Sequence, residues 1–324
     1  MASERNAGMS VPRRSPRVQM IDGQPRSIFL DAGLVRAALR FKPRDGDIIQ
    51  VTYPKSGTHW VQQITQLILN KGESVANFSE FVKKSPFLEY HGEPAFEGMS
   101  SPRTIRTHFP LTRENFSKNA KYVYVARNPW DCCVSFYHHV RSLPLYEFQD
   151  GTFDEFFEAY MKGNVGYGNY FDHVLSGYSR KDEPNVFFIT YEALKKDTPG
   201  SVLALAYFLG EDYGRLLEQS DELFQKVLRK SSPEFMKKVM EVDFNELMAT
   251  FHTNRNPATD ISDPTKQAQK NGPATFNFVR KGKVGDWKEH FTPEQFQRMR
   301  ATIDEKSKGT NLMDFWQSDD IRFA

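Results

Sequence analysis

The sequence predicts an α/β protein: a single domain with a central, mainly parallel sheet flanked by helices. Strand-like runs alternate with helical runs along the chain, which is the pattern of parallel strands joined by helices. Hydrophobic residues make up 39% of the 324 residues and charged residues 26%, a composition typical of a globular domain. The most apolar run, residues 202–209, is too short to span a bilayer. We expect a disordered tail at residues 1–24 and the domain at residues 25–324.

Three short segments rich in β-branched and aromatic residues are the predicted strands. They are DIIQVT at 47–52, KYVYVA at 121–126 and VFFIT at 186–190. Residues of this kind pack well on the pleated surface of a sheet.

A helix is predicted after each of the first two strands. Apolar residues recur at helical spacing from Trp60 to Ile68, and Gly72 is a plausible stop. The second helix starts with Asn128 as its N-cap and Pro129 at the first helical position. Further helices are predicted at 202–209, ended by Gly210, and after Thr292, where TPEQ forms a capping box.

Residues 252–275 fit no regular element. Ile261 is the only large aliphatic residue there, while Asn, Asp, Thr, Pro and Gly abound. The segment is either a solvated loop or a lid, and its flanking sequence favours a lid.

Charge and cysteine usage restrict the class of protein. Lys and Arg number 43 against 41 Asp and Glu, giving a formal net charge of +2. This near balance gives no general attraction to nucleic acid or to a membrane surface, so any anion site must be local. Cys132 and Cys133 are adjacent and badly placed for a disulfide, and residues 1–19 contain no apolar stretch typical of a secretory signal. We therefore expect a cytoplasmic protein.

The turn YPKSGTHW at 53–60 has the composition of an anion-binding loop. A strand, a glycine-containing turn and a helix N-terminus present unpaired backbone N–H groups to an anion. Gly57 permits a close approach of the backbone, Ser56 and Thr58 offer hydroxyl groups, and Lys55 adds a charge. Without further support, an ordinary strand–helix turn with a surface lysine is equally consistent with these residues.

This turn differs from the P-loop of nucleotide hydrolases, because its lysine precedes the glycine. P-loop enzymes hold Mg²⁺ partly through an acidic residue at the end of a neighbouring strand. The comparable strand here, 121–126, is followed by Arg127, which would repel Mg²⁺ and bind a phosphate directly. The pattern favours a polyanion site without a metal and disfavours an ATP-dependent kinase.

Four segments resemble the signature regions of the cytosolic sulfotransferases. They are TYPKSGTHW (52–60), YVARNPWDCCVSFYHH (124–139), TYEALKKD (190–197) and RKGKVGDWK (280–288). The segments follow in that family's order, and the resemblance extends over roughly residues 25 to 300. It implies a P-loop-like phosphosulfate-binding loop and transfer of a sulfuryl group from 3′-phosphoadenosine 5′-phosphosulfate (PAPS) to a small-molecule acceptor, without a metal. The product would be adenosine 3′,5′-bisphosphate (PAP).

The resemblance also implies the donor site. The residues that it assigns to the 5′-phosphosulfate, the 3′-phosphate and the adenine are Lys55, Ser56, Gly57, Thr58, His59, Trp60, Arg127, Ser135, Tyr191, Ser231, Arg280, Lys281 and Gly282. Trp60 would stack on the adenine, whereas Arg127, Ser135 and residues 280–282 would hold the 3′-phosphate. Pro233 stands where relatives have a phenylalanine that backs the adenine.

Three residues are implied in catalysis. His108 matches the general base of the family, although a lone histidine after a strand is more often structural. Lys55 would offset charge on the leaving phosphate oxygen. Arg106 replaces a lysine of most relatives and is expected to steady the transferring group.

An aromatic acceptor pocket is implied by Phe87, Tyr90, His108 and His139. Such a slot favours a flat phenolic ring. An imidazole or the nearby Glu89 could also bind an amine or a second hydroxyl, which suggests a catecholamine-like acceptor. The dimer motif of relatives is altered, with Gln297 in the place of an acid, so a monomer or weak homodimer is expected. The alternative functions are a non-catalytic PAPS or small-aromatic binder and, less favoured, the kinase.

Overall fold

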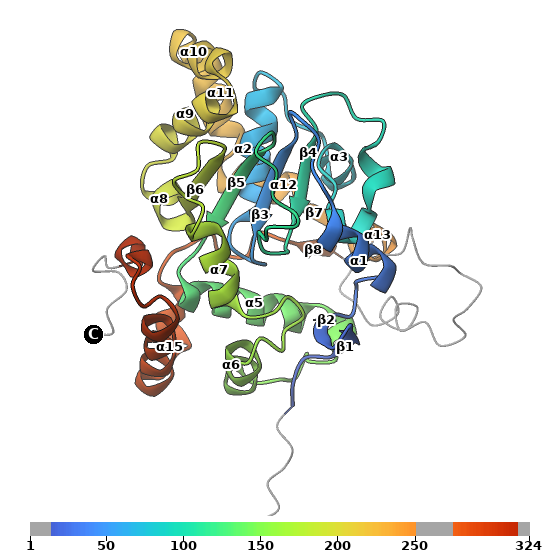
Figure 1. Cartoon of the computed structure of the whole chain (residues 1–324), viewed down its shortest axis with the longest axis vertical. Coiled ribbons are helices and arrows are strands. Elements are labelled where there is room, and N and C mark those ends of the chain that lie inside the picture. The colour runs from blue at the N-terminus through green and yellow to red at the C-terminus, as the bar shows by residue number, and fades with distance from the viewer. Residues whose placement is uncertain (1–13, 251–274, 317–324) are drawn as a thin grey trace, which may run out of the picture.

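A four-stranded parallel sheet forms the centre of the molecule (Figure 1). The computed structural model describes residues 14–250 and 275–316. In the sheet the strands follow the order β4 (Thr104–Thr107), β3 (Ile48–Thr52), β5 (Lys121–Ala126) and β6 (Val186–Thr190). Every neighbouring pair is parallel. The predicted fold class and the three predicted strands are confirmed.

Helices cover both faces of this sheet, because strand residues alternate between two hydrophobic clusters. On one face, Val123 and Val125 pack with α2 (Thr58–Leu69), α9 (Thr198–Leu209) and α11 (Asp221–Lys230). On the other face, Tyr122 and Tyr124 belong to the cluster that includes α5 (Pro129–Ser142), α6 (Phe153–Met161) and α7 (Tyr170–Tyr178). Figure 1 shows α9–α11 at the top of the view and α5, α6 and α15 at the bottom.

The remaining elements are short or peripheral. They are α1 (Ala32–Arg40), α3 (Phe78–Lys84), α4 (Leu88–His91), η1 (Glu93–Phe96), η2 (Pro144–Tyr146), α8 (Tyr191–Lys196), α10 (Glu211–Gln219), α12 (Pro233–Val239), α13 (Phe244–Thr250), η3 (Asp286–Glu289), α15 (Pro293–Lys306) and η4 (Leu312–Trp316). β1 (Val18–Ile21) and β2 (Gln24–Ser27) form one antiparallel hairpin, and β7 (Glu241–Asp243) pairs with β8 (Thr275–Asn277). Within the described ranges, no helix combines the length and apolarity needed to cross a membrane.

Two predicted helix starts are confirmed in detail. The Asn128 side chain accepts a hydrogen bond from the Asp131 N–H at 2.8 Å, and Pro129 opens α5. Thr292 and Gln295 form the expected reciprocal capping box of α15. Both caps satisfy backbone donors that a helix leaves unpaired at its first turn.

The predicted boundary between tail and domain at residue 24 is wrong. Val18–Ile21 pairs with Gln24–Ser27, and the Ser27 N–H donates to the Gly166 carbonyl at 3.0 Å. The second strand is polar and each strand is only four residues long, so the hairpin depends on these tertiary contacts more than on a strand-like sequence. Residues 1–13 lie outside the described residues, as does the predicted lid up to residue 274.

A buried ion pair joins the approach to β3 to the edge strand β4. Arg103 donates to both carboxylate oxygens of Asp47, at 2.7 and 2.6 Å, and both side chains are almost fully buried. The pair lies directly before the first paired residues of the two strands, Ile48 and Thr104, and each charge depends on the other because both are removed from water.

Replacing one partner of this pair should destabilise the fold. In Asp47→Asn the Arg103 guanidinium keeps its charge in a buried site without a carboxylate, so we expect a loss of about 3 kcal/mol in the free energy of unfolding. Chemical denaturation measures this loss. The control is Asp22→Asn in the exposed Asp22–Arg36 pair, where the loss should be much smaller. Equal losses in the two variants would contradict the assignment.

Candidate active site

The turn between β3 and α2 takes a backbone shape that suits an anion. Lys55 has φ 71° and Gly57 has φ 105°, both in the left-handed region. Gly57 caps α2 without a side-chain hydrogen bond, so the first N–H groups of this twelve-residue helix have no side-chain acceptor at the cap. A Cβ at Gly57 would lie 2.9 Å from Tyr191 Cδ2, which explains the need for glycine. The turn fits the predicted cradle for a phosphosulfate.

Most of the predicted site residues line a single cavity of about 180 Å³. They are Lys55, Gly57, Thr58, His59, Trp60, Phe87, Tyr90, His108, Arg127, Ser135, His139, Tyr191, Arg280, Lys281 and Gly282. Ser56, Arg106 and Ser231 are buried and do not line it. Sequence reasoning did not single out Lys195 and Lys283, which also line it, although both lie within the recognised motifs.

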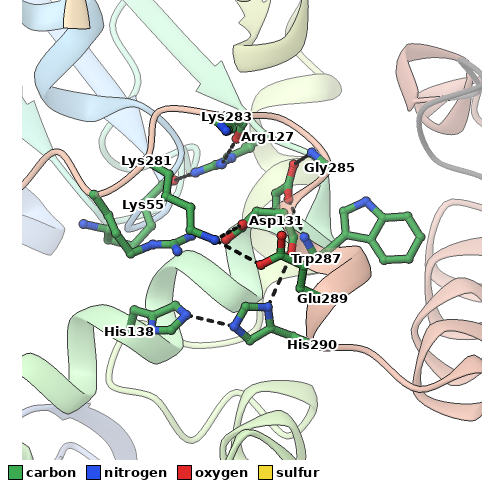
Figure 2. Close-up of polar contacts among 12 residues, drawn as sticks. Lys55, Arg127, Asp131, His138, Lys281, Lys283, Gly285, Trp287, Glu289 and His290 are labelled. Atoms are coloured by element: carbon green, nitrogen blue, oxygen red, sulfur yellow. Dashed lines mark hydrogen bonds and ion pairs between the residues drawn. The ribbon is translucent and has the colours of Figure 1, made fainter. Parts of the chain in front are cut away.

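Cations from three distant segments meet at one end of this cavity (Figure 2). Arg127 donates from Nη1 to the Lys55 carbonyl and from Nη2 to the Lys283 carbonyl, both at 3.1 Å. Its guanidinium also lies over the Tyr191 ring at 4.5 Å. The Nε atom of Arg127 is buried and has no hydrogen-bond partner in the described part of the chain. An anion at this end would meet a rigid donor that is already oriented.

Two carboxylates hold the segment that carries Arg280 and Lys281. Asp131 accepts hydrogen bonds from the backbone N–H groups of Gly285 at 2.8 Å and Trp287 at 3.0 Å. Asp286 pairs with Arg280 and with Lys281. The sequence identified Asp131 only as an acidic residue in a first helical turn, and nothing in its spacing indicated a partner more than 150 positions away.

The predicted adenine end is formed by Trp60 and Tyr191, whose rings meet edge to face at 5.3 Å. Trp60 Nε1 donates to the Ser231 carbonyl at 2.9 Å. The Ser231 hydroxyl donates to the Leu228 carbonyl and keeps its lone pairs, so its expected contact with the adenine stays a prediction. The Ser231 carbonyl positions Trp60. Ser56 Oγ, for its part, lies 3.7 Å from Cys132 Sγ behind the turn.

His108 is held at three points. Its ring Nδ1 lies 2.8 Å from the Thr52 carbonyl oxygen, and because that oxygen can only accept, Nδ1 carries the proton. Nε2 is then left with a free lone pair. The backbone N–H donates to Glu89 at 2.8 Å, and the carbonyl lies 3.2 Å from His173 Nε2. Burial lowers the pKa of His108 to about 3, so the imidazole is neutral near pH 7.

Arg106 does not reach the cavity, which corrects the expected contact with a transferring group. Its guanidinium lies 4.2 Å from the centre of the Phe87 ring and 5.0 Å from that of Phe81, and Nε donates to the Ser85 carbonyl at 2.6 Å. Arg106 is therefore a positioning residue for the wall of the cavity.

Aromatic rings form the other end of the cavity. Phe87 lies 4.7 Å from His108 between ring centres, and the hydroxyls of Tyr90 and Tyr167 are hydrogen-bonded to each other. The ring of His59 lies here, 4.5 Å from Phe278, rather than among the cations. The His59 side chain therefore lies with the aromatic rings, and the assignment of His59 to the donor site stays a prediction.

Comparisons with known proteins agree with this geometry. The family model of the sulfotransferase domain matches residues 45–311. Sulfotransferase 1B1 of Canis lupus familiaris is 33% identical over 91% of this chain and 94% of its own length. Amine sulfotransferase of Oryctolagus cuniculus is 33% identical over 86% of this chain and 87% of its own. The crystal structure of mouse sulfotransferase SULT7A1 complexed with PAP matches with a TM-score of 0.67 and 28% identity, over 91% of this chain and 95% of that one.

The chain belongs to the sulfotransferase family. It is a PAPS-dependent sulfotransferase, and its residues fit the donor. The uncapped N-terminus of α2 and the buried Nε of Arg127 are the donors that phosphate groups require. This sulfotransferase thus concentrates positive charge at one end of its cavity despite a net charge of only +2.

Lys55 should make PAP binding weaker as the pH rises above 8. Burial, and then the charges of Arg127 and Arg280, lower the pKa of Lys55 to about 8 in the free protein. Lys55 is charged below this value and neutral above it, so phosphate binding above pH 8 must take up a proton. We expect the Kd for PAP to rise by up to about tenfold per pH unit above pH 8, measured by calorimetry.

The matched control is Lys55→Arg, whose side chain keeps its charge throughout this range. Its Kd for PAP should not rise between pH 8 and pH 9.5. If the affinity of the wild type for PAP stays constant over the same range, Lys55 does not take up a proton when PAP binds, and the prediction is wrong.

Proposed function

We propose that this sulfotransferase moves a sulfuryl group from PAPS to the hydroxyl of a small phenolic acceptor, with His108 as the general base. The observation that carries the proposal is the fixed tautomer of His108, which leaves the lone pair of Nε2 available at the cavity. A base within hydrogen-bond reach of the acceptor can remove the hydroxyl proton as the oxygen attacks.

When bound, PAPS supplies an activated sulfuryl group. The acceptor O–H bond breaks and its proton passes to His108, while the acceptor oxygen bonds to sulfur and the bond from sulfur to the phosphate oxygen breaks. Lys55 and the N–H groups at the start of α2 offset the negative charge that then gathers on that phosphate oxygen. The chain contributes mainly positioning and fixed charge, as in phosphoryl transfer.

The shape of the cavity supports a flat acceptor. Phe87, Tyr167 and Phe136 surround the His108 side with aromatic surface. The names of the relatives do not choose an acceptor, because an amine sulfotransferase and a 3-alpha-hydroxysteroid sulfotransferase of Cavia porcellus match at 33% and 34% identity. A phenol and the catecholamine-like compound suggested by the sequence share the aromatic hydroxyl that the proposal needs.

Two rival functions make different predictions. Membership of the sulfotransferase family disfavours the ATP-dependent kinase. A non-catalytic PAPS or small-aromatic binder would need neither the fixed tautomer of His108 nor a lysine at the anion-binding turn. The monomeric or weakly dimeric state and the cytoplasmic location stay predictions.

Replacing His108 with Ala should reduce kcat for sulfation by about 10²- to 10⁴-fold, because the general base is lost. The assay follows transfer from sulfate-labelled PAPS to a panel of small phenols, amines and sterols without added metal. PAP binding by calorimetry serves as the control for folding and for the donor site, and it should persist. Wild-type protein that binds PAP but sulfates nothing in the panel would favour the non-catalytic binder.

The pH profile gives a second readout of the same proposal. Since burial lowers the pKa of His108 to about 3, the free enzyme keeps a neutral imidazole throughout the range from pH 5 to pH 8. We expect kcat/KM for the acceptor to show no loss on acidification through pH 6.5, where an ordinary histidine would become protonated. A fall in kcat/KM on acidification through pH 6.5 would contradict a buried base that stays neutral.

A further inference from the structure

Seven aromatic rings that line the cavity at its acceptor end form a closed series of ring contacts, or belt. We call these residues the aromatic belt. Successive ring centres lie 4.5 Å (His59–Phe278), 6.3 Å (Phe278–His139), 6.2 Å (His139–Phe136), 6.2 Å (Phe136–Tyr167), 5.4 Å (Tyr167–His108), 4.7 Å (His108–Phe87) and 6.4 Å (Phe87–His59) apart. A planar acceptor would fit within such a belt.

Three rings of the belt are imidazoles, and only His108 has a role so far. His59 comes from the first turn of α2 and His139 from the last turn of α5, so neither is a neighbour of His108 in the chain. A slot that only packed apolar surface would need no imidazoles, because polar groups are costly to bury without a hydrogen bond. The Nδ1 atom of His139 is buried and has no hydrogen-bond partner among the described residues.

The two additional imidazoles are neutral at neutral pH. Burial, followed by the charges of nearby cations, lowers the pKa of both His59 and His139 well below the usual value. A neutral imidazole offers one N–H donor and one lone pair. A hydroxyl both donates and accepts, so it matches such a group in either orientation.

The described lining of the cavity offers no carboxylate to a cationic acceptor. None of the described residues that line the cavity is Asp or Glu. Its lining does include six cations, which are Lys55, Arg127, Lys195, Arg280, Lys281 and Lys283. Glu89 is fully buried and does not line the cavity. A protonated amine would enter without a carboxylate to pair with, which makes its desolvation costly.

We propose that His59 and His139 are acceptor-recognition residues, which hydrogen-bond a second, uncharged hydroxyl on an aromatic acceptor whose first hydroxyl faces His108. The favoured acceptors are therefore neutral phenols with a second hydroxyl, and phenols with an ammonium group are disfavoured. This inference rests on the proposed function and refines its acceptor class.

Three matched phenols test the proposal in the wild-type enzyme with saturating PAPS. 4-(2-Hydroxyethyl)phenol carries the second hydroxyl, 4-ethylphenol lacks it, and 4-(2-aminoethyl)phenol replaces it with an ammonium group. Catechol, resorcinol and hydroquinone then vary the spacing of two hydroxyls on one ring. We expect the best diol to exceed its monophenol about three- to tenfold in kcat/KM. The aminoethyl compound should fall at least tenfold below the hydroxyethyl compound.

The variants His59→Phe and His139→Phe keep an aromatic ring in the belt and remove the nitrogens. In at least one of them the diol-to-monophenol ratio of kcat/KM should fall toward one. His138→Phe is the matched control, because His138 is the neighbour of His139 but turns away from the cavity and pairs with His290 at 2.9 Å (Figure 2). It should preserve the wild-type ratio. PAP binding by each variant checks that the fold and the donor site persist.

The possible outcomes separate this inference from the proposed function. If the wild type sulfates phenols but both Phe variants retain the wild-type diol-to-monophenol ratio, recognition by the imidazoles is refuted. Equal kcat/KM for the ammonium and hydroxyl compounds would refute the charge argument. If no phenol is sulfated at all although PAP binds, the proposed function itself fails.

Discussion

Like charges must be held together around the donor end of the cavity, and much of the surrounding structure serves this constraint. Lys55, Arg127 and Arg280 lie close enough for the two arginines to lower the pKa of the lysine. Their mutual repulsion would spread them apart unless fixed groups opposed it. Asp131 and Asp286 supply the opposing charge, one through backbone N–H groups and the other by direct pairing.

Glu192 extends this support to the start of α5. It accepts hydrogen bonds from the backbone and side chain of Asn128, at 3.0 and 2.8 Å, and from Trp316 Nε1 at 3.1 Å. Asn128 in turn caps the helix that follows Arg127. Hydrogen bonds therefore link the cap of α5 to α8 and to Trp316, and the guanidinium of Arg127 is oriented by its own two hydrogen bonds before an anion binds. Such preorganisation is the main source of electrostatic catalysis.

The sequence was sufficient for the architecture and for the shape of the anion-binding turn, because both depend on local patterns. A strand followed by a glycine turn and a helix start can be recognised within ten residues, as at Lys55 and Gly57. Side-chain direction was harder to predict. Arg106 and His108 are two residues apart, a spacing that would place them on one side of a strand, but β4 ends at Thr107: Arg106 packs behind Phe87 while the ring of His108 reaches the cavity. His59 was assigned to the donor with its neighbour Trp60, although successive residues of a helix face different ways and the His59 ring lies beside Phe278.

Contacts between distant segments could not be predicted from spacing at all. The hairpin at Val18–Ile21 is ordered through Ser27 and Gly166, and Asp131 meets Gly285 across more than 150 residues. Nothing in the local composition of either segment indicates its partner. The aromatic belt could not be predicted for the same reason, because its members come from six separate segments.

The two ends of the cavity differ in electrostatic character, and this difference follows from the chemistry of the reaction. The donor end is cationic, which suits the polyanion PAPS, whereas the general base that we propose must remain unprotonated beside those same cations. Burial gives His108 that property: it lowers the pKa of the imidazole, and the Thr52 carbonyl fixes the proton on Nδ1. A carboxylate base in this position would be attracted to Lys55 and would weaken its pairing with phosphate. A neutral imidazole accepts a proton without competing for the cations, so a histidine suits the junction between the charged and the aromatic ends.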